Sequence, residues 1–155
     1  MKDKDRKKLL RRLEILLFAA YLAMLCYFLF FAENMGRTFT ERTYHYNLML
    51  FREIKRFWVY RHSLGTWSVM LNLVGNVVAF IPLGMLLPRL FEKSRKFLPT
   101  VFFCFEFSLC VEIIQLVFKV GSFDVDDILL NTAGGVLGYL FYKIFVAKVR
   151  AWRSK

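Results

Sequence analysis

Four long apolar stretches set the strongest limit on what this 155-residue chain can fold into. They cover residues 13–32, 67–88, 97–118 and 128–147, approximately. An α-helix rises 1.5 Å per residue, so about 20 apolar residues cross the hydrocarbon core of a bilayer. Hydrophobic residues make up 57% of the chain and aromatic residues 18%, more than a soluble domain usually carries. The sequence therefore predicts an all-α membrane protein, a single domain (1–155) that forms a bundle of four transmembrane helices.

The distribution of Lys and Arg predicts how this bundle is oriented. Sixteen of the 23 lie in the N-terminal tail, in the 89–96 loop and at the C-terminal end, and seven lie in the 33–66 and 119–127 loops. Positive residues favour the cytoplasmic side of a membrane. We therefore expect a multi-pass membrane protein with both termini cytoplasmic and with membrane lipids as partners. Because the cations fall between apolar runs rather than on a soluble face, the pattern does not favour a nucleic-acid partner.

The 33–66 loop, on the predicted outer side, contains an amphipathic segment. In residues 47–60 the apolar Leu50, Ile54 and Trp58 recur at helical spacing, and Arg52 and Lys55 fall on the opposite side. This pattern predicts a helix that lies on the outer membrane surface. A helix packed across the mouth of the bundle would produce the same pattern.

Polar residues inside the predicted spans are the candidates for function, because polar groups in hydrocarbon are costly and tend to face a bundle interior or a wet cavity. With the predicted topology, eight of them fall in the outer halves of their helices or at the outer surface. They are Asn72, Asn76, Glu112, Gln115, Asp124, Asp126, Asp127 and Asn131. The simplest interpretation is one polar binding site that opens to the outside. The alternative is that they only hold helices together through hydrogen bonds.

The acidic segment of residues 124–127 allows two further interpretations. Carboxylates are typical ligands of Mg²⁺, so Asp124, Asp126 and Asp127 could hold a divalent cation. The segment lacks the glycine and the distal glutamate of an EF-hand, however. Aspartates at the start of a helix are also common N-terminal caps. The sequence thus predicts no certain cofactor, with Mg²⁺ or another divalent cation as an alternative.

Several short segments together resemble the VanZ-like family. The segments are Asn72–Asn76, Phe80–Gly84, Glu112–Gln115, Phe123–Asp127 and Asn131–Gly135, with Asn47–Phe51 and Glu53–Ile54 in the outer loop. Their order and spacing match the family over residues 44–142. The chain departs from the family in having Leu50 where Pro is usual. It also lacks the Arg that many members carry before the acidic segment, for which Lys119 is the nearest substitute.

The resemblance implies a bacterial four-helix membrane protein linked to resistance against teicoplanin, a lipoglycopeptide antibiotic. It implies no known reaction. Our leading hypothesis is a binding protein whose polar site takes a lipid-linked cell-wall precursor or the antibiotic itself. One alternative is a metal-dependent enzyme acting on a lipid phosphate or isoprenoid-linked substrate, with Glu112 as acid or base. Another is a structural membrane subunit whose polar face binds a further helix.

Overall fold

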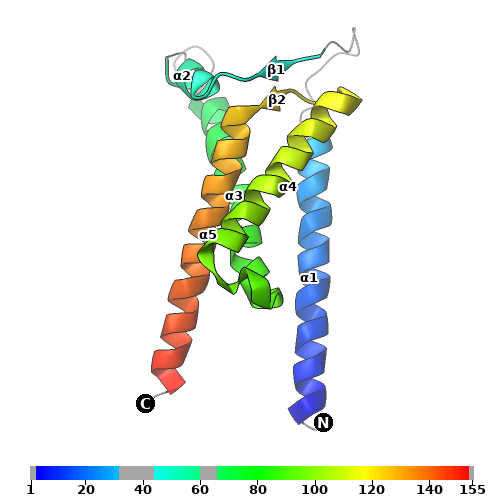
Figure 1. Ribbon diagram of the computed structural model, residues 1–155, viewed down its shortest axis with the longest axis vertical. Helices are drawn as coiled ribbons and strands as arrows, with labels where there is room; N and C mark the ends of the chain where they lie inside the picture. The colour runs from blue at the N-terminus through cyan, green and yellow to red at the C-terminus, as the bar shows by residue number, and fades with distance from the viewer. Residues whose placement is uncertain (1–2, 32–43, 60–65, 154–155) are drawn as a thin grey trace. The chain divides into compact units, whose positions relative to one another are not determined.

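The computed structural model describes residues 3–31, 44–59 and 66–153 and is almost entirely helical (Figure 1). Four of its helices are long and apolar enough to cross a membrane, which confirms the predicted all-α membrane fold. The elements in chain order are α1 (Asp3–Phe31), β1 (Tyr46–Asn47), α2 (Arg52–Val59), α3 (Thr66–Leu90), the 3₁₀ helix η2 (Glu92–Arg95), α4 (Phe97–Phe118), β2 (Phe123–Asp124) and α5 (Val125–Arg153). Residues 32–43 and 60–65 of the predicted outer loop lie outside the described residues.

The chain divides into two compact units, residues 1–38 and 39–155. The first contains α1, a helix of 29 residues. It begins well before the predicted span at residue 13, because the basic N-terminal segment continues the same helix. Such cationic residues at the end of an apolar helix suit a membrane interface. All the other elements belong to the second unit.

In the second unit, α3 and α5 approach so closely that glycine is required between them. A Cβ added to Gly134 would lie 2.1 Å from the carbonyl oxygen of Val77, and one added to Gly138 would lie 2.0 Å from that of Ile81. On the other side, a Cβ on Gly84 would lie 2.0 Å from the carbonyl oxygen of Gly135. Membrane helices associate largely through van der Waals packing, and small residues let their backbones approach. Gly134 and Gly138, four residues apart in α5, therefore form a close contact with α3, which we call the seam.

α4 packs against α5 with a face that is partly polar. Its buried residues are Thr100, Cys104, Ser108, Val111, Glu112 and Gln115. At the start of the helix the Thr100 hydroxyl donates to the carbonyl oxygen of Ser94 at 2.5 Å, which fixes η2. The Tyr139 hydroxyl of α5 donates to the carbonyl oxygen of Arg95 at 3.0 Å. These bonds hold the α3–α4 connection against α5.

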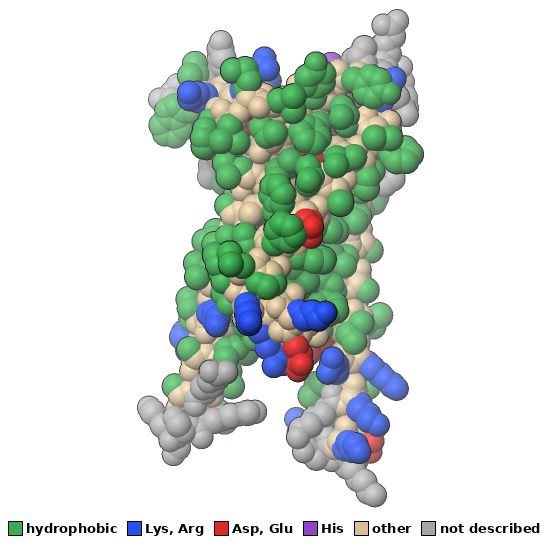
Figure 2. Space-filling view, viewed as in Figure 1, with side chains coloured by type: hydrophobic (Ala, Val, Ile, Leu, Met, Phe, Trp, Pro, Cys, Tyr) green, Lys and Arg blue, Asp and Glu red, His purple; other side chains and the backbone are tan. Residues whose placement is uncertain are grey.

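The opposite face of α4 and much of α5 expose hydrophobic side chains, which Figure 2 shows gathered along the helices. Phe102, Phe105 and Ile113 are exposed on α4, and Leu140 and Ile144 on α5. In water such a surface would be unfavourable, whereas a membrane-spanning helix is expected to present it to lipid. The exposed surface is therefore that of a membrane protein.

Residues 44–59, which we call the cap, cover the end of the second unit where α5 begins (Figure 1). Strand β1 in the cap pairs in parallel with β2, with Tyr46 opposite Phe123 and Asn47 opposite Asp124. Helix α2 follows, so the predicted amphipathic helix is present but begins at Arg52 rather than at residue 47. The first residues of the predicted helix are used by the strand and by a turn. Helix α5 likewise begins at Val125, three residues earlier than the predicted span.

Candidate functional site

Asp126, in the first turn of α5, holds the start of helix α2. Its carboxylate accepts a hydrogen bond from the backbone N–H of Phe51 and another, at 3.4 Å, from that of Ile54. The first N–H groups of a helix have no partner within the helix, and a carboxylate there is favoured by the helix dipole. Asp126 is fully buried. It therefore caps α2 from another part of the chain, across 75 residues of sequence.

Phe51 adopts an unusual backbone conformation at this contact. Its φ is +64°, in the left-handed region that favours glycine. This conformation costs an ordinary residue about 1–2 kcal/mol. The bond from its N–H to Asp126 supports it, and its carbonyl oxygen accepts the first hydrogen bond within α2, from the N–H of Lys55 at 3.0 Å. The cap is thus held by tertiary contacts, because an eight-residue helix is not stable by itself.

Asp124 joins the cap to the start of α5. Its Oδ1 accepts hydrogen bonds from the Asn47 side chain at 3.1 Å and from the backbone N–H of Asp126 at 2.8 Å. The second bond is the N-cap arrangement, so Asp124 is the residue that caps α5. Asn47 in turn accepts a bond from the N–H of Met49 at 3.2 Å, which shapes the turn that leads to α2.

Glu112 attaches this network to α4. Its Oε2 accepts the backbone N–H of Asp124 at 2.8 Å, and both residues are buried. Gln115, one turn further along α4, is buried against the chain where it leaves the helix. A Cβ on Gly121 would lie 2.9 Å from the Gln115 side chain, and the N–H of Val120 donates to the Gln115 carbonyl oxygen at 3.0 Å. Glu112 and Gln115 thus fix the α4–β2 connection.

Two further polar contacts lie along α5. Asn76 of α3 donates to Asp127 at 2.6 Å. Deeper in the helix, Asn131 donates to the Ser108 hydroxyl of α4 at 2.9 Å. Asn131 is 1% exposed, and its Oδ1 has no hydrogen-bond partner within the part of the chain that the structure describes. The side chain of Asn72, the remaining predicted site residue, lies outside the described residues.

The seven predicted site residues whose side chains the structure describes therefore divide into separate groups. Asp124, Asp126 and Glu112 belong to one network, with Gln115 one turn from Glu112, whereas Asn76 with Asp127 and Asn131 with Ser108 form two pairs. Asn47 is the member that the sequence-based selection of site residues omitted. It lies in the outer-loop segment that resembles the family, and that was the signal available for it.

The three aspartates are directed toward three different partners rather than toward a common point. Asp124 bonds Asn47, Asp126 bonds the start of α2, and Asp127 bonds Asn76. Among the described residues, no group of three His, Cys, Asp or Glu side chains is arranged to hold a metal ion. This geometry gives no support to the predicted divalent-cation site.

The charge balance of the network depends on α2. Burial raises the pKa of the Asp124 carboxyl above its ordinary value, the hydrogen bonds from Asp126 and Asn47 lower it, and the nearby negative charge of Asp126 raises it. Arg56, on α2, lowers it. Lys119, the expected cation, instead has its ammonium group 4.2 Å from the centre of the Tyr44 ring, a cation–π contact with the cap. Arg56 is therefore the cation that acts on Asp124, whereas Lys119, the nearest substitute for the Arg of the family, contacts Tyr44.

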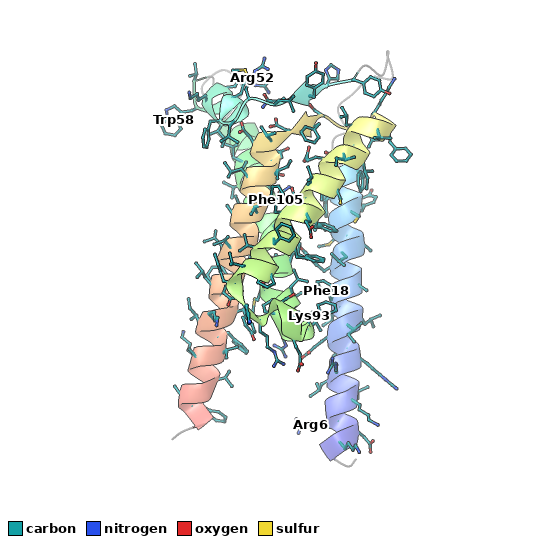
Figure 3. The ribbon with its side chains drawn as sticks, in the orientation of Figure 1. Arg6, Phe18, Arg52, Trp58, Lys93 and Phe105 are labelled. Carbon is teal, nitrogen blue, oxygen red and sulfur yellow. The ribbon has the colours of Figure 1, made fainter. Side chains whose placement is uncertain are left out.

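The outer surface of the cap combines large apolar side chains with cations. Leu48, Met49 and Trp58 are exposed, Trp58 to 71%. Arg52 and Lys55 are also exposed, and Figure 3 shows Arg52 and Trp58 extending from α2 away from α5. Aromatic and basic side chains together are typical of a segment at a membrane–water interface. The buried carboxylates hold the cap in place, and its outward side chains are the ones available to a ligand.

Four membrane-length helices, three of them in a unit that a cap on a buried polar network closes at one end, define a multi-pass helical membrane protein. Residues 18–146 match the sequence profile of the VanZ/LLP1 family, and the chain belongs to that family. It is similar to Protein VanZ of Enterococcus faecium, with 44% identity over 71 residues. That match covers 46% of this chain and 44% of the relative. No solved structure matches the chain.

Proposed function

We propose that this protein lowers the susceptibility of a bacterium to teicoplanin-type lipoglycopeptide antibiotics by binding, without turnover, at its capped end. The ligand would be a lipid-linked cell-wall precursor or the acyl-bearing part of the antibiotic. Membership of the VanZ/LLP1 family supports the link to these antibiotics. The site would face the outer leaflet of the bacterial cytoplasmic membrane, which agrees with the distribution of Lys and Arg along the chain.

The docking of the cap by Asp126 is the observation that carries this proposal. Buried carboxylates fix the backbone at the start of α2, and this orients a surface that combines exposed apolar and cationic groups. Apolar side chains such as Met49 and Trp58 suit an acyl or isoprenoid chain, since burial of apolar surface is favourable. Arg52 and Lys55 suit a phosphate, which Arg and Lys bind through charge-assisted hydrogen bonds. Both chemistries occur together in a lipid-linked precursor.

Reversing the charges of the cap tests the proposal. In a teicoplanin-susceptible Gram-positive host, the double variant Arg52→Glu/Lys55→Glu should lose most of the protection that the wild-type chain gives. Its level in the membrane should remain normal, because both side chains are exposed. The matched control is Lys93→Glu/Lys96→Glu, two exposed cations at the α3–α4 connection, where Figure 3 shows Lys93. Full protection by the cap variant at normal abundance would contradict the proposal.

Removing one charge from the polar network, or from the separate Asn76–Asp127 pair, addresses the supporting role of these groups. Glu112→Gln and Asp127→Asn preserve shape, and each should reduce protection while the protein still accumulates.

An enzyme would behave differently in a second assay. In vesicles with a lipid-linked precursor, we expect retention of the lipid on the protein and no phosphate release with or without Mg²⁺. Release of phosphate or head group that requires Mg²⁺ and stops with a chelator would establish the metal-dependent enzyme instead.

Impermeant thiol reagents can test the proposed orientation in intact cells. A cysteine in place of Lys119, at the capped end, should be labelled from outside, and one in place of Ser94, in η2, should not. The reason is the excess of cations in the 89–96 loop over the 119–127 loop. The opposite labelling pattern would place the cap in the cytoplasm, where it could not meet an antibiotic outside the membrane.

A further inference from the structure

Helix α4 carries two glutamates on opposite faces, and they have opposite environments. Glu112 lies on the buried face with Cys104, Ser108 and Gln115. Glu106 is exposed, as are Phe102 and Cys110, one turn before and one turn after it. Spacings of three and four residues place these side chains on one face of a helix. Glu106 therefore lies on the outward face of α4, away from the polar network described above.

The depth of Glu106 makes this exposure unusual. It is nine residues from the start of a helix of 22 residues, so it lies about 14 Å along the helix, near the middle of the span. Its exposed neighbours Phe102, Phe103 and Phe105 are all apolar, and Figure 3 shows Phe105 on this helix. Glu106 makes no hydrogen bond or ion pair with residues 44–59 or 66–153, the described residues of its own unit. A carboxyl group facing lipid at this depth is costly, so such residues usually meet a partner.

The sequence limits the chemistry of that partner. No Lys, Arg or His occurs in residues 13–31, 66–88, 97–118 or 125–142, the apolar parts of the four spanning helices. Neither this chain nor a second copy of it can therefore offer Glu106 a cation at that depth. A second copy can offer another carboxyl group. Two carboxyl groups that retain a proton can each donate and accept a hydrogen bond, so a pair of them satisfies itself.

We propose that the outward face of α4 binds the same face of a second copy of this chain, with Glu106 of each copy hydrogen-bonded to the other. Two-fold symmetry brings the same patch of both subunits together. With the axis perpendicular to the membrane, residues of equal depth meet, so the Glu106 pair and the Cys110 pair both lie at the interface. Phe102 and Ile113 supply apolar packing on either side. Interhelical hydrogen bonds of this kind stabilise association within hydrocarbon.

Cross-linking through Cys110 tests the interface in the full chain, in membranes. Cys26→Ala leaves Cys110 as the exposed thiol, since Cys104 is buried. A short bis-maleimide should then give a product of doubled mass. The collision control carries Cys110→Ala and Ala133→Cys, which moves the thiol to an exposed position eight residues from the capped end of α5, as Cys110 is from that of α4. This control should give little dimer.

Substitutions of Glu106 separate carboxyl pairing from simple apolar contact. Glu106→Leu should lower the dimer yield about 3- to 30-fold, the value of one interhelical hydrogen bond. Glu106→Gln should retain it, because two amides also pair. Glu106→Lys should abolish it, and co-expression of that variant with a differently tagged wild-type chain should restore a mixed dimer. Glu92→Leu, which removes an exposed carboxyl from η2, is the control.

Four outcomes would overturn this proposal. The first is a wild-type chain that gives no more dimer than the collision control. The second is a Glu106→Leu variant with unchanged yield. The third concerns the chain with Cys26 retained: a cross-link between Cys26 and Cys110 within one monomer would show that α1 covers this face instead. A Cys110 cross-link to a different membrane protein, with no homodimer, would likewise exclude the second copy as the partner.

Discussion

The α3–α5 seam and the cap contact are built by opposite means. At the seam, Gly134 and Gly138 let two backbones approach with no side chain between them. At the cap, buried carboxylates bridge segments that are far apart in sequence. Close packing at every point resists any added atom, whereas a contact made of a few hydrogen bonds can be weakened one bond at a time. We therefore expect the fold to depend on the seam, and the cap to respond to its surroundings separately.

Adding a side chain to the seam should have the largest effect. In Gly138→Val the new Cβ would meet the Ile81 carbonyl oxygen and the Met85 nitrogen, so α3 and α5 must separate. We expect a loss of about 3 kcal/mol in the free energy of unfolding, as for a severely overpacked core. Unfolding in mixed micelles with increasing denaturing detergent would measure it. Gly75→Ala is the matched control in α3, because a Cβ there meets nothing within 4 Å. Equal effects of the two substitutions would remove the distinction between seam and surface.

Removing the carboxylate that docks the cap should have an intermediate and local effect. Asp126→Ala leaves the N–H groups of Phe51 and Ile54 without their acceptor. Hydrogen bonds to a charged group contribute about 1.5–3 kcal/mol, so amides of residues 45–59 should exchange with deuterium more than tenfold faster. Amides in the middle of α3 and α5 should be unchanged. The exchange rates in Asp126→Asn, which retains one acceptor oxygen, should lie between those in Asp126→Ala and those in the wild type. Faster exchange throughout the bundle would mean that cap and seam form one cooperative unit.

The seam was predictable from the sequence in a way that the cap was not. Four spans follow from length and hydropathy, and Gly134 with Gly138 gives the small-residue spacing that favours close helix packing. Topology also predicted that the acidic residues would gather at the end of the bundle where α5 begins. The spans and the glycine spacing could be predicted because they depend on patterns along single helices, whereas a common outer site for the acidic residues stays a prediction. The selection of site residues omitted Asn47, although its segment is one of those that match the family.

The individual partners of the carboxylates could not be read from the sequence. Helical spacing gives the face on which Glu112 lies, but its acceptor role toward the Asp124 N–H depends on how the chain turns after α4. Asp126 caps α2 rather than α5, an arrangement that only tertiary docking determines. Sequence distance made Lys119 the nearest substitute for the Arg of the family, whereas Arg56 of α2 is the cation that lowers the pKa of Asp124. Contacts between segments that are far apart in the sequence leave no periodic pattern of residues from which they could be predicted.

Acidity should shift the docking of the cap, and this effect should be the smallest of the three. Burial raises the pKa of Asp124 in the docked state, so in that state Asp124 holds its proton up to a higher pH than in the undocked state. The free energy of docking is therefore most favourable below the ordinary titration range of Asp. It becomes less favourable as the pH rises through the raised pKa of Asp124, and above that pH it no longer changes.

Opposing charges limit the size of this change. Arg56 and the hydrogen bonds from Asp126 and Asn47 favour the ionised form of Asp124, and the carboxyl of Asp126 opposes it. Exchange of the amides in residues 45–59, corrected for the intrinsic pH dependence of exchange, should speed up modestly across that window. Asp124→Asn keeps an acceptor for Asn47 and removes the titration, so its corrected profile should be flat. A wild-type profile that is equally flat, or one that rises in the opposite direction, would show that the electrostatics of Asp124 do not control the cap. The cap would then be held by the pairing of β1 with β2 and by hydrogen bonds such as those to Asp126.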